Sequence, residues 1–205
     1  MWIAFVGYAT LFAPADRGNT AALIMNALLM DTDKVDAGVI AVFNLLGVVP
    51  ALYASLLLAD GAGRRVPAWP FVIGSCFLGA FALVPYLALR EDDGRFLGER
   101  RGFVRFFDSR VVGIGLLLST LSLVGFGLMR GELTRYRALF ETEALVHVMT
   151  IDFILLTVLF PTVLASDMAR RGLQNRRLFS LISCIPLFGP AFYVALRPAL
   201  SETTR

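Results

Sequence analysis

Long apolar runs separated by short polar segments dominate this chain. A helix rises about 1.5 Å per residue, so about 20 apolar residues are needed to cross a hydrocarbon core of about 30 Å. Five of the runs have this length. The pattern therefore predicts five transmembrane helices, over residues 37–59, 67–89, 111–129, 145–166 and 178–196.

The apolar segment over residues 2–13 is shorter than these runs. As a helix it would extend about 18 Å, so we expect either a short first span or a helix at the membrane interface. The predicted fold class is all-α, a polytopic transmembrane helix bundle. The spans and their loops occupy nearly the whole length, so the sequence predicts a single integral membrane domain over residues 1–205.

Composition agrees with this prediction. Hydrophobic residues make up 57% of the chain and charged residues 17%, and the mean hydropathy is +0.71. Membrane lipids are therefore expected partners. The net charge is only +3 and the basic residues are spread over the loops, which argues against a nucleic-acid partner. Cys76 and Cys184 lie in apolar runs without the spacing of metal ligands.

Motifs of membrane enzymes are missing from the sequence. The chain has one histidine, too few for a multi-histidine iron site, and it has no H-E-x-x-H, G-x-S-x-G or Walker glycine loop. We therefore expect a non-catalytic protein.

Two polar residues interrupt the run "HVMTIDFILLTVLFP", His147 and Asp152. On a regular helix they point about 140° apart, so they belong to separate contacts. Asp152 lies well inside the run, where a carboxylate needs a partner, a proton or an ion. It is a candidate buried polar contact or a proton or ion site. His147 lies near the end of the run, as an interfacial hydrogen-bonding group or an axial ligand for chlorophyll magnesium or haem iron.

The ends and interiors of the runs carry further signals. Tyr86 and Tyr193 lie near run ends, where aromatic rings favour the headgroup level. Arginine pairs are expected to flank the membrane, or to contact anionic lipid or partner subunits; they stand at 64–65, 100–101, 170–171 and 176–177. Prolines inside the runs predict kinks, or broken helices that line a site; they are Pro50, Pro85, Pro161, Pro186 and Pro190.

Two short strings recur along the chain. "PALYAS" at 50–55 is similar to "PTVLAS" at 161–166, and "YLALR" at 86–90 is similar to "YVALR" at 193–197. Both recur at nearly the same offset, so the segments 37–90 and 145–197 are candidate copies of one unit. If each run crosses the membrane once, three crossings separate equivalent positions. The two copies would then be inverted, as in many secondary transporters.

Several longer strings carry a resemblance to a known family: "FNLLGVVPALY", "VPAWPF", "GAFALVPYLALRE", "DSR", "HVMTIDF", "FPTVLASDMARRGL" and "PLFGPAFYVALRP". With them, the chain resembles an uncharacterised family of small multi-span membrane proteins of cyanobacteria and plastid-bearing eukaryotes. The resemblance covers residues 40 to 198. It implies an oxygenic photosynthetic setting, and hence a thylakoid or plastid envelope membrane.

In that setting we expect a non-catalytic thylakoid protein, an accessory or linker subunit of a larger photosynthetic complex such as a photosystem or its antenna. Chlorophyll and carotenoid are the candidate cofactors. His147 is the first candidate ligand for chlorophyll, with Asn44 and Gln174 as further candidates. Two alternatives remain open: a small secondary transporter or channel with inverted repeats, and a transient assembly factor of photosynthetic complexes.

Overall fold

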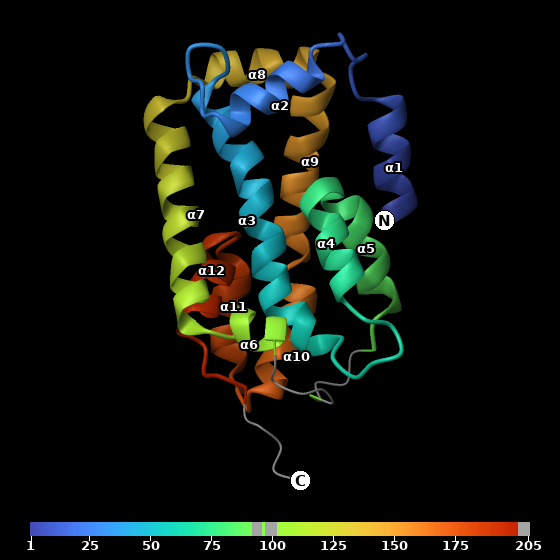
Figure 1. Cartoon of the computed structure of the whole chain (residues 1–205), viewed down its shortest axis with the longest axis vertical. Helices are drawn as coiled ribbons and strands as arrows, with labels where there is room; N and C mark the ends of the chain where they lie inside the picture. Colours follow the sequence, from blue (N-terminus) through green and yellow to red (C-terminus); the bar gives the residue numbers. More distant parts are fainter. Residues whose placement is uncertain (92–95, 97–101, 201–205) are drawn as a thin grey trace.

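The computed structural model describes residues 1–91, 96 and 102–200 of the chain (Figure 1). The arginine pair at 100–101 lies outside the described residues. Every regular element in the described part is an α-helix, as the sequence predicts. The helices are α1 (Trp2–Leu11), α2 (Thr20–Leu28), α3 (Ala37–Asp60), α4 (Trp69–Leu78), α5 (Ala80–Leu89), α6 (Gly102–Phe107), α7 (Arg110–Arg130), α8 (Leu133–Thr142), α9 (Ala144–Leu159), α10 (Pro161–Arg170), α11 (Arg176–Cys184) and α12 (Phe188–Leu196).

Three helices are long and apolar enough to cross a membrane: α3, α7, and α9 with α10 counted as one helix over Ala144–Arg170. They correspond to the predicted spans 37–59, 111–129 and 145–166. Two of these helices begin at a residue whose side chain caps the helix. The Asp36 carboxylate accepts the Gly38 N–H at the start of α3, and the Ser109 hydroxyl accepts the Val112 N–H at the start of α7. Such caps satisfy backbone donors that have no partner within the helix.

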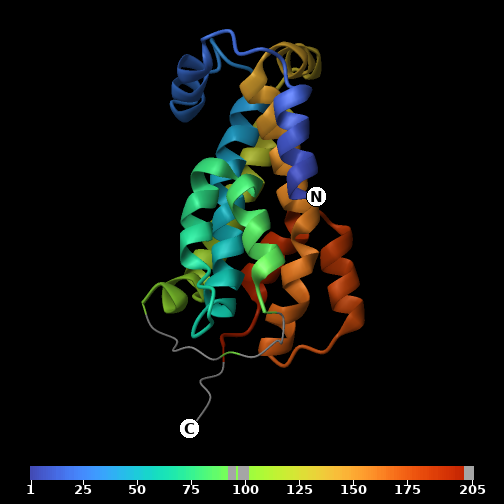
Figure 2. The same ribbon diagram turned by 90° about the vertical axis from the view of Figure 1, so that its right-hand side faces the viewer.

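The other two predicted spans, 67–89 and 178–196, are wrong as single crossings. Gly79 has a φ of +53° and separates α4 from α5, while Leu187 has a φ of +65° after Pro186 and separates α11 from α12. Each pair of helices folds back on itself as a hairpin (Figure 2). Helices of 9 or 10 residues reach about 15 Å, half of a hydrocarbon core of about 30 Å.

These half-length hairpins determine the direction of the repeat. The first repeat consists of α3 and the hairpin α4–α5, and the second consists of α9–α10 and the hairpin α11–α12. Because each hairpin returns to the end from which it started, α3 and α9–α10 run in the same direction, downward in Figure 1. The two copies are therefore parallel, and the expected inversion is wrong.

The N-terminal segment forms α1, shorter than the predicted 2–13 element and too short to cross a membrane. It runs along the bundle above the α4–α5 hairpin rather than flat across its end (Figure 2). Its first turn is attached to α5, because the Trp2 indole N–H donates to the Phe81 carbonyl at 2.8 Å and the Phe5 ring packs on Phe81.

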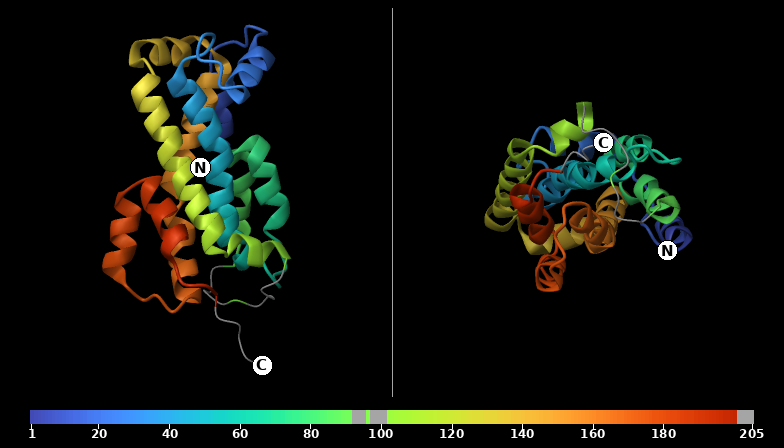
Figure 3. Two further views of the ribbon diagram at one scale, coloured as in Figure 1. Left: turned by 60° about the vertical axis from the view of Figure 1, so that its left-hand side comes forward. Right: turned by 90° about the horizontal axis from the view of Figure 1, so that it is seen from below.

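Short helices lie at both ends of the bundle. α2 and α8 lie across the upper end in Figure 1, and α6 lies at the lower end. α7 stands between α3 and α12, and glycines permit the close approach. A Cβ built on Gly113 would lie 2.5 Å from the Val194 carbonyl oxygen, and one on Gly127 would lie 2.8 Å from the Ala41 Cβ. Figure 3 shows the α11–α12 hairpin beside the lower part of α7.

Candidate functional site

Two similar polar clusters form at the lower end of the bundle. In the first cluster, the Tyr86 hydroxyl donates to Asp60 at 3.2 Å and the Arg90 guanidinium donates to the same carboxylate at 3.3 Å. In the second cluster, Tyr193 donates to Asp167 at 2.7 Å and Arg197 donates at 2.9 Å. In each repeat the aspartate comes from the end of the long helix. The tyrosine and arginine come from the descending half of the hairpin.

Each arginine also reaches the long helix of the other repeat. Arg90 donates to the Thr162 carbonyl at 2.6 Å and to the Ser166 hydroxyl at 3.2 Å. In the same way, Arg197 donates to the Ser55 carbonyl at 2.7 Å. At the sequence separation that relates Asp60 to Asp167, Ser55 corresponds to Thr162, so the two contacts with backbone carbonyls are equivalent. The two clusters therefore hold the repeats together by an exchange of equivalent contacts.

Arg170 joins the two clusters directly. It forms a short ion pair with Asp60, and its Nη2 lies 3.9 Å from an Asp167 oxygen. Arg171 donates to Asp167 at 2.8 Å and pairs with Asp108 at 2.8 Å. The side chains of Arg170 and Arg171 are 0% exposed, so they contact carboxylates of this chain rather than anionic lipid or a partner subunit. At Arg170 the Nε and Nη2 atoms are buried without a hydrogen bond to a described residue, so its ion pair with Asp60 offsets only part of the hydration that burial removes.

Burial and neighbouring carboxylates act in opposite directions on the pKa values of the buried arginines. Burial acts to lower the pKa of the Arg171 guanidinium, but the Asp167 and Asp108 carboxylates outweigh it and hold that pKa above its ordinary value. At Arg197 burial is the largest effect, and the pKa of its guanidinium lies below its ordinary value. Arginine is not deprotonated in proteins, so both side chains remain cationic at neutral pH.

The sequence contains a signal for these clusters that the recurring strings alone do not reveal. The separation of Asp60 from Asp167 along the chain is identical to that of Tyr86 from Tyr193. Tyr86 is 1% exposed and Tyr193 is 5% exposed, so their hydroxyl groups serve contacts inside the bundle. A search for polar residues that repeat at the tyrosine offset would have found the two aspartates.

Asp152 occupies a separate site, at the tip of the α4–α5 hairpin. Its Oδ1 accepts the N–H of Ala80, the first residue of α5, at 2.7 Å. The approach is so close that a Cβ on Gly79 would overlap Oδ2. Asp152 is 5% exposed. A helix N-terminus carries a partial positive charge, so the carboxylate has a favourable partner without a cation.

His147 lies in the first turn of α9, between one and two turns before Asp152. Its Nε2 is 2.8 Å from the Tyr8 hydroxyl and its Nδ1 is 3.0 Å from the Phe140 carbonyl. The Tyr8 and Phe140 rings also stack on the imidazole. Both ring nitrogens are thus engaged, and ligation of a metal would require the loss of one hydrogen bond. His147 and Asp152 form two sites, as the helical spacing predicts.

The other candidate pigment ligands do not join His147. The Asn44 amide donates to the carbonyls of Ala27 and Ile40, which attaches α2 to α3. Gln174 is exposed in the turn after α10, at the opposite end of the bundle from His147, beside a hollow of about 310 Å³. The three predicted ligands therefore lie at three separate places.

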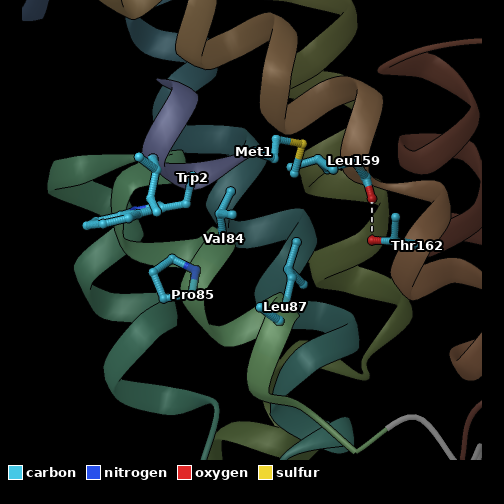
Figure 4. Close-up of a pocket in the computed structure, with 9 residues that line it drawn as sticks. Met1, Trp2, Val84, Pro85, Leu87, Leu159 and Thr162 are labelled. Carbon is cyan, nitrogen blue, oxygen red and sulfur yellow. Dashed lines mark hydrogen bonds between the residues drawn. The ribbon is translucent and has the colours of Figure 1, made fainter. Parts of the chain in front are cut away.

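An apolar groove opens on the outside of the bundle beside α1, α5 and the junction of α9 with α10 (Figure 4). Its volume is about 680 Å³. The Thr162 hydroxyl at its wall donates to the Leu159 carbonyl. The groove is lined by Met1, Trp2, Ile3, Val84, Pro85, Leu87, Ala88, Leu159 and Thr162.

Comparisons with known proteins add no relative: no protein-family model, no curated protein and no solved structure matches the chain. The candidate sites therefore rest on the geometry alone.

Proposed function

We propose that this protein is a small, non-catalytic integral membrane transporter built from two parallel repeats. The observation that carries the proposal is the pair of half-length hairpins, α4–α5 and α11–α12, at corresponding positions of the two repeats. In transporters, interrupted helices at corresponding positions of repeated halves form substrate and ion sites near the bilayer midplane. Parallel repeats related by an axis along the membrane normal are one of the two known arrangements.

The arrangement of apolar surface supports a place in a bilayer. α3, α7 and the helix Ala144–Arg170 have the length and hydropathy of membrane spans. Helices α2 and α8 lie across one end of these spans and α6 lies at the other end (Figure 1). They expose large apolar side chains, such as Leu29 on the turn after α2, Leu133 on α8 and Phe103 on α6. Amphipathic segments at both ends are typical of a slab with two interfaces.

The cross-repeat contacts supply the closed end that a transporter of this kind requires. Arg90, Arg170 and Arg197 each join one repeat to the other at the lower end of the bundle. Replacement of a whole buried ion pair by apolar residues often leaves the stability of a protein unchanged. Removal of one member of the pair is strongly destabilising, because it leaves a buried charge without a partner. Such contacts have two discrete states, made or broken, which suits a gate. Separation of the repeats at this end would open a path toward the hairpin tips.

Flux through liposomes tests the proposal. Purified full-length protein is reconstituted, and uptake is followed for amino acids, sugars, small carboxylates and monovalent cations, with internal pyranine reporting protons. We expect at least one of these probes to cross faster than in protein-free liposomes, with a rate that saturates as its concentration rises. If every probe crosses at the protein-free rate, the protein is not a transporter.

The accessory subunit of a photosynthetic complex is a second candidate, and α7 supplies the observation that favours it. In the apolar 18-residue stretch that identifies α7 as a candidate span, only 11% is buried inside the chain, whereas the corresponding share for α3 is 61%. Its outward side chains include Val111, Leu118 and Leu128. A whole helix face left open in this way suits the surface of a larger membrane complex, in the thylakoid setting that the family resemblance implies.

Native gel electrophoresis of membranes that contain the chain separates the two candidates. Comigration with a large green complex supports the subunit, and loss of pigment on His147→Leu would identify the chlorophyll ligand. A colourless species of the size of a monomer or dimer supports the transporter.

A further inference from the structure

We infer that Asp152 is a reversible proton-binding site and that its protonation releases the α4–α5 hairpin from α9. This inference rests on the proposed transport function and assigns the proton as the coupling ligand. Asp152 is a buried carboxylate on the long helix α9, and it lies against the tip of the α4–α5 hairpin. The two are in direct contact at Ala80.

The surroundings of Asp152 contain no cation among the described residues. No arginine or lysine of that part of the chain pairs with it, and its one hydrogen bond comes from a backbone N–H. Burial therefore favours the protonated acid, and the N-terminus of α5 favours the carboxylate. A group held between two such opposed effects can exchange its proton when the local structure changes.

The titratable groups on neighbouring helices are engaged elsewhere. On α3 and α5, Tyr53 donates to the Leu156 carbonyl, and Asp60 and Tyr86 belong to the first cluster. On α1 and α8, Tyr8 contacts His147 and Tyr136 contacts Thr150. The two arginines of α8 are exposed: Arg135 donates to the Lys34 carbonyl and Arg137 pairs with Glu141.

The remaining groups lie on α4, α9 and α10. Cys76 is exposed on α4. Glu143, at the start of α9, pairs with Arg17. Asp167 and Arg170, at the end of α10, lie in the clusters of the lower end. A proton on Asp152 is thus exchanged without an ion-pair partner.

The hairpin responds because its tip depends on the charge. Ionised Asp152 accepts the Ala80 N–H and interacts favourably with the dipole of α5. Protonation removes the charge and weakens both interactions. Gly79 has a φ of +53°, which a glycine adopts readily. The link between α4 and α5 can therefore rearrange once the hydrogen bond between Asp152 and the Ala80 N–H is broken.

Infrared difference spectroscopy on the reconstituted full-length protein tests proton binding directly. We expect a protonated carboxyl band to titrate between about pH 4 and 9 and to be absent in Asp152→Asn. Dicyclohexylcarbodiimide, which reacts with protonated carboxyls in apolar surroundings, should label Asp152 in the unaltered protein. Glu141→Gln, on the exposed face of α8, is the matched control and should leave the band and the labelling unchanged.

Hydrogen exchange of the first turn of α5 tests release of the hairpin. Protection should fall as the carboxyl band appears, and Asp152→Asn should hold it low at every pH. Asp152→Glu should restore pH dependence if the amide variant has simply weakened the fold. The inference is overturned if the Asp152 carboxyl group does not titrate. It is also overturned if the hydrogen-exchange protection of α5 stays constant while that group titrates. Either result leaves the flux test of transport unaffected, while absence of flux with a titrating Asp152 refutes transport alone.

Discussion

Arg197 donates a hydrogen bond of 2.7 Å to the carbonyl of Ser55, 142 residues away in the chain. The contact has a counterpart in the other repeat, where Arg90 donates to the Thr162 carbonyl at 2.6 Å. Because each arginine donates to the other repeat, neither repeat satisfies the hydrogen bonds of its own lower end. Stability of the two halves should therefore depend on the same small group of arginines and aspartates.

Arg197→Gln tests this dependence. The change removes the ion pair with Asp167 and leaves that buried carboxylate with fewer partners. Removal of one member of a buried pair costs about 3–5 kcal/mol of unfolding free energy. Thermal unfolding of the detergent-solubilised protein should therefore occur at a much lower temperature. Arg137→Gln, which breaks the exposed pair with Glu141, should change the unfolding temperature little, and an equal effect of both changes would contradict the account.

Tyr86→Phe and Tyr193→Phe compare the two clusters. Each change removes one hydroxyl that donates to a buried aspartate, and a hydrogen bond to a charged group is worth about 1.5–3 kcal/mol. We expect losses of similar size in the two variants by thermal unfolding. Tyr136→Phe, which removes a contact with the neutral Thr150 hydroxyl, is the control and should cost less. A large loss in only one cluster would mean that the repeats are not equivalent.

Gly79→Ala tests the close approach of Asp152 to the hairpin tip. The new Cβ would overlap the Asp152 Oδ2, and the φ of +53° is unfavourable for alanine. Gly18→Ala places alanine at a φ of +76° in open space, and so isolates the backbone effect. The Gly79 variant should express poorly or unfold at a far lower temperature than the Gly18 variant. Equal behaviour would show that the tip does not press on Asp152.

Gly113→Ala and Gly115→Ala form a matched pair on α7. A Cβ at Gly113 would meet the Val194 carbonyl oxygen at 2.5 Å, whereas nothing lies within 4 Å of a Cβ at Gly115. The first change should force α7 away from α12 and lower the unfolding temperature. The second should leave stability unchanged or raise it slightly, because alanine is the better helix former.

The sequence predicted the long helices well, because hydropathy and length report a continuous apolar helix directly. It failed at 67–89 and 178–196, because two antiparallel half-helices have the same composition as one full crossing. The only local signs of the reversals are Gly79 and the turn at Pro186 and Leu187. A single glycine or proline in an apolar run is also compatible with a kink.

The candidate sites were predicted unevenly for a related reason. Helical spacing alone separated His147 from Asp152, and the structure places them against different helices. The ion clusters were missed because Arg170 and Arg171 look like flanking charge when read in order. Their partners, Asp60 and Asp108, lie in distant parts of the sequence. Only the fold brings these residues together.

Movement of the α4–α5 hairpin against the long helices is measured most directly by a distance distribution. Spin labels at Phe77 on α4 and Met129 on α7, both 85% exposed, report the position of the hairpin against a long helix, after Cys76 and Cys184 are changed to serine. The account predicts two distances whose populations shift with pH, and a distribution in Asp152→Asn that no longer responds to pH. A single distance, unchanged by pH and by Asp152→Asn, would contradict it.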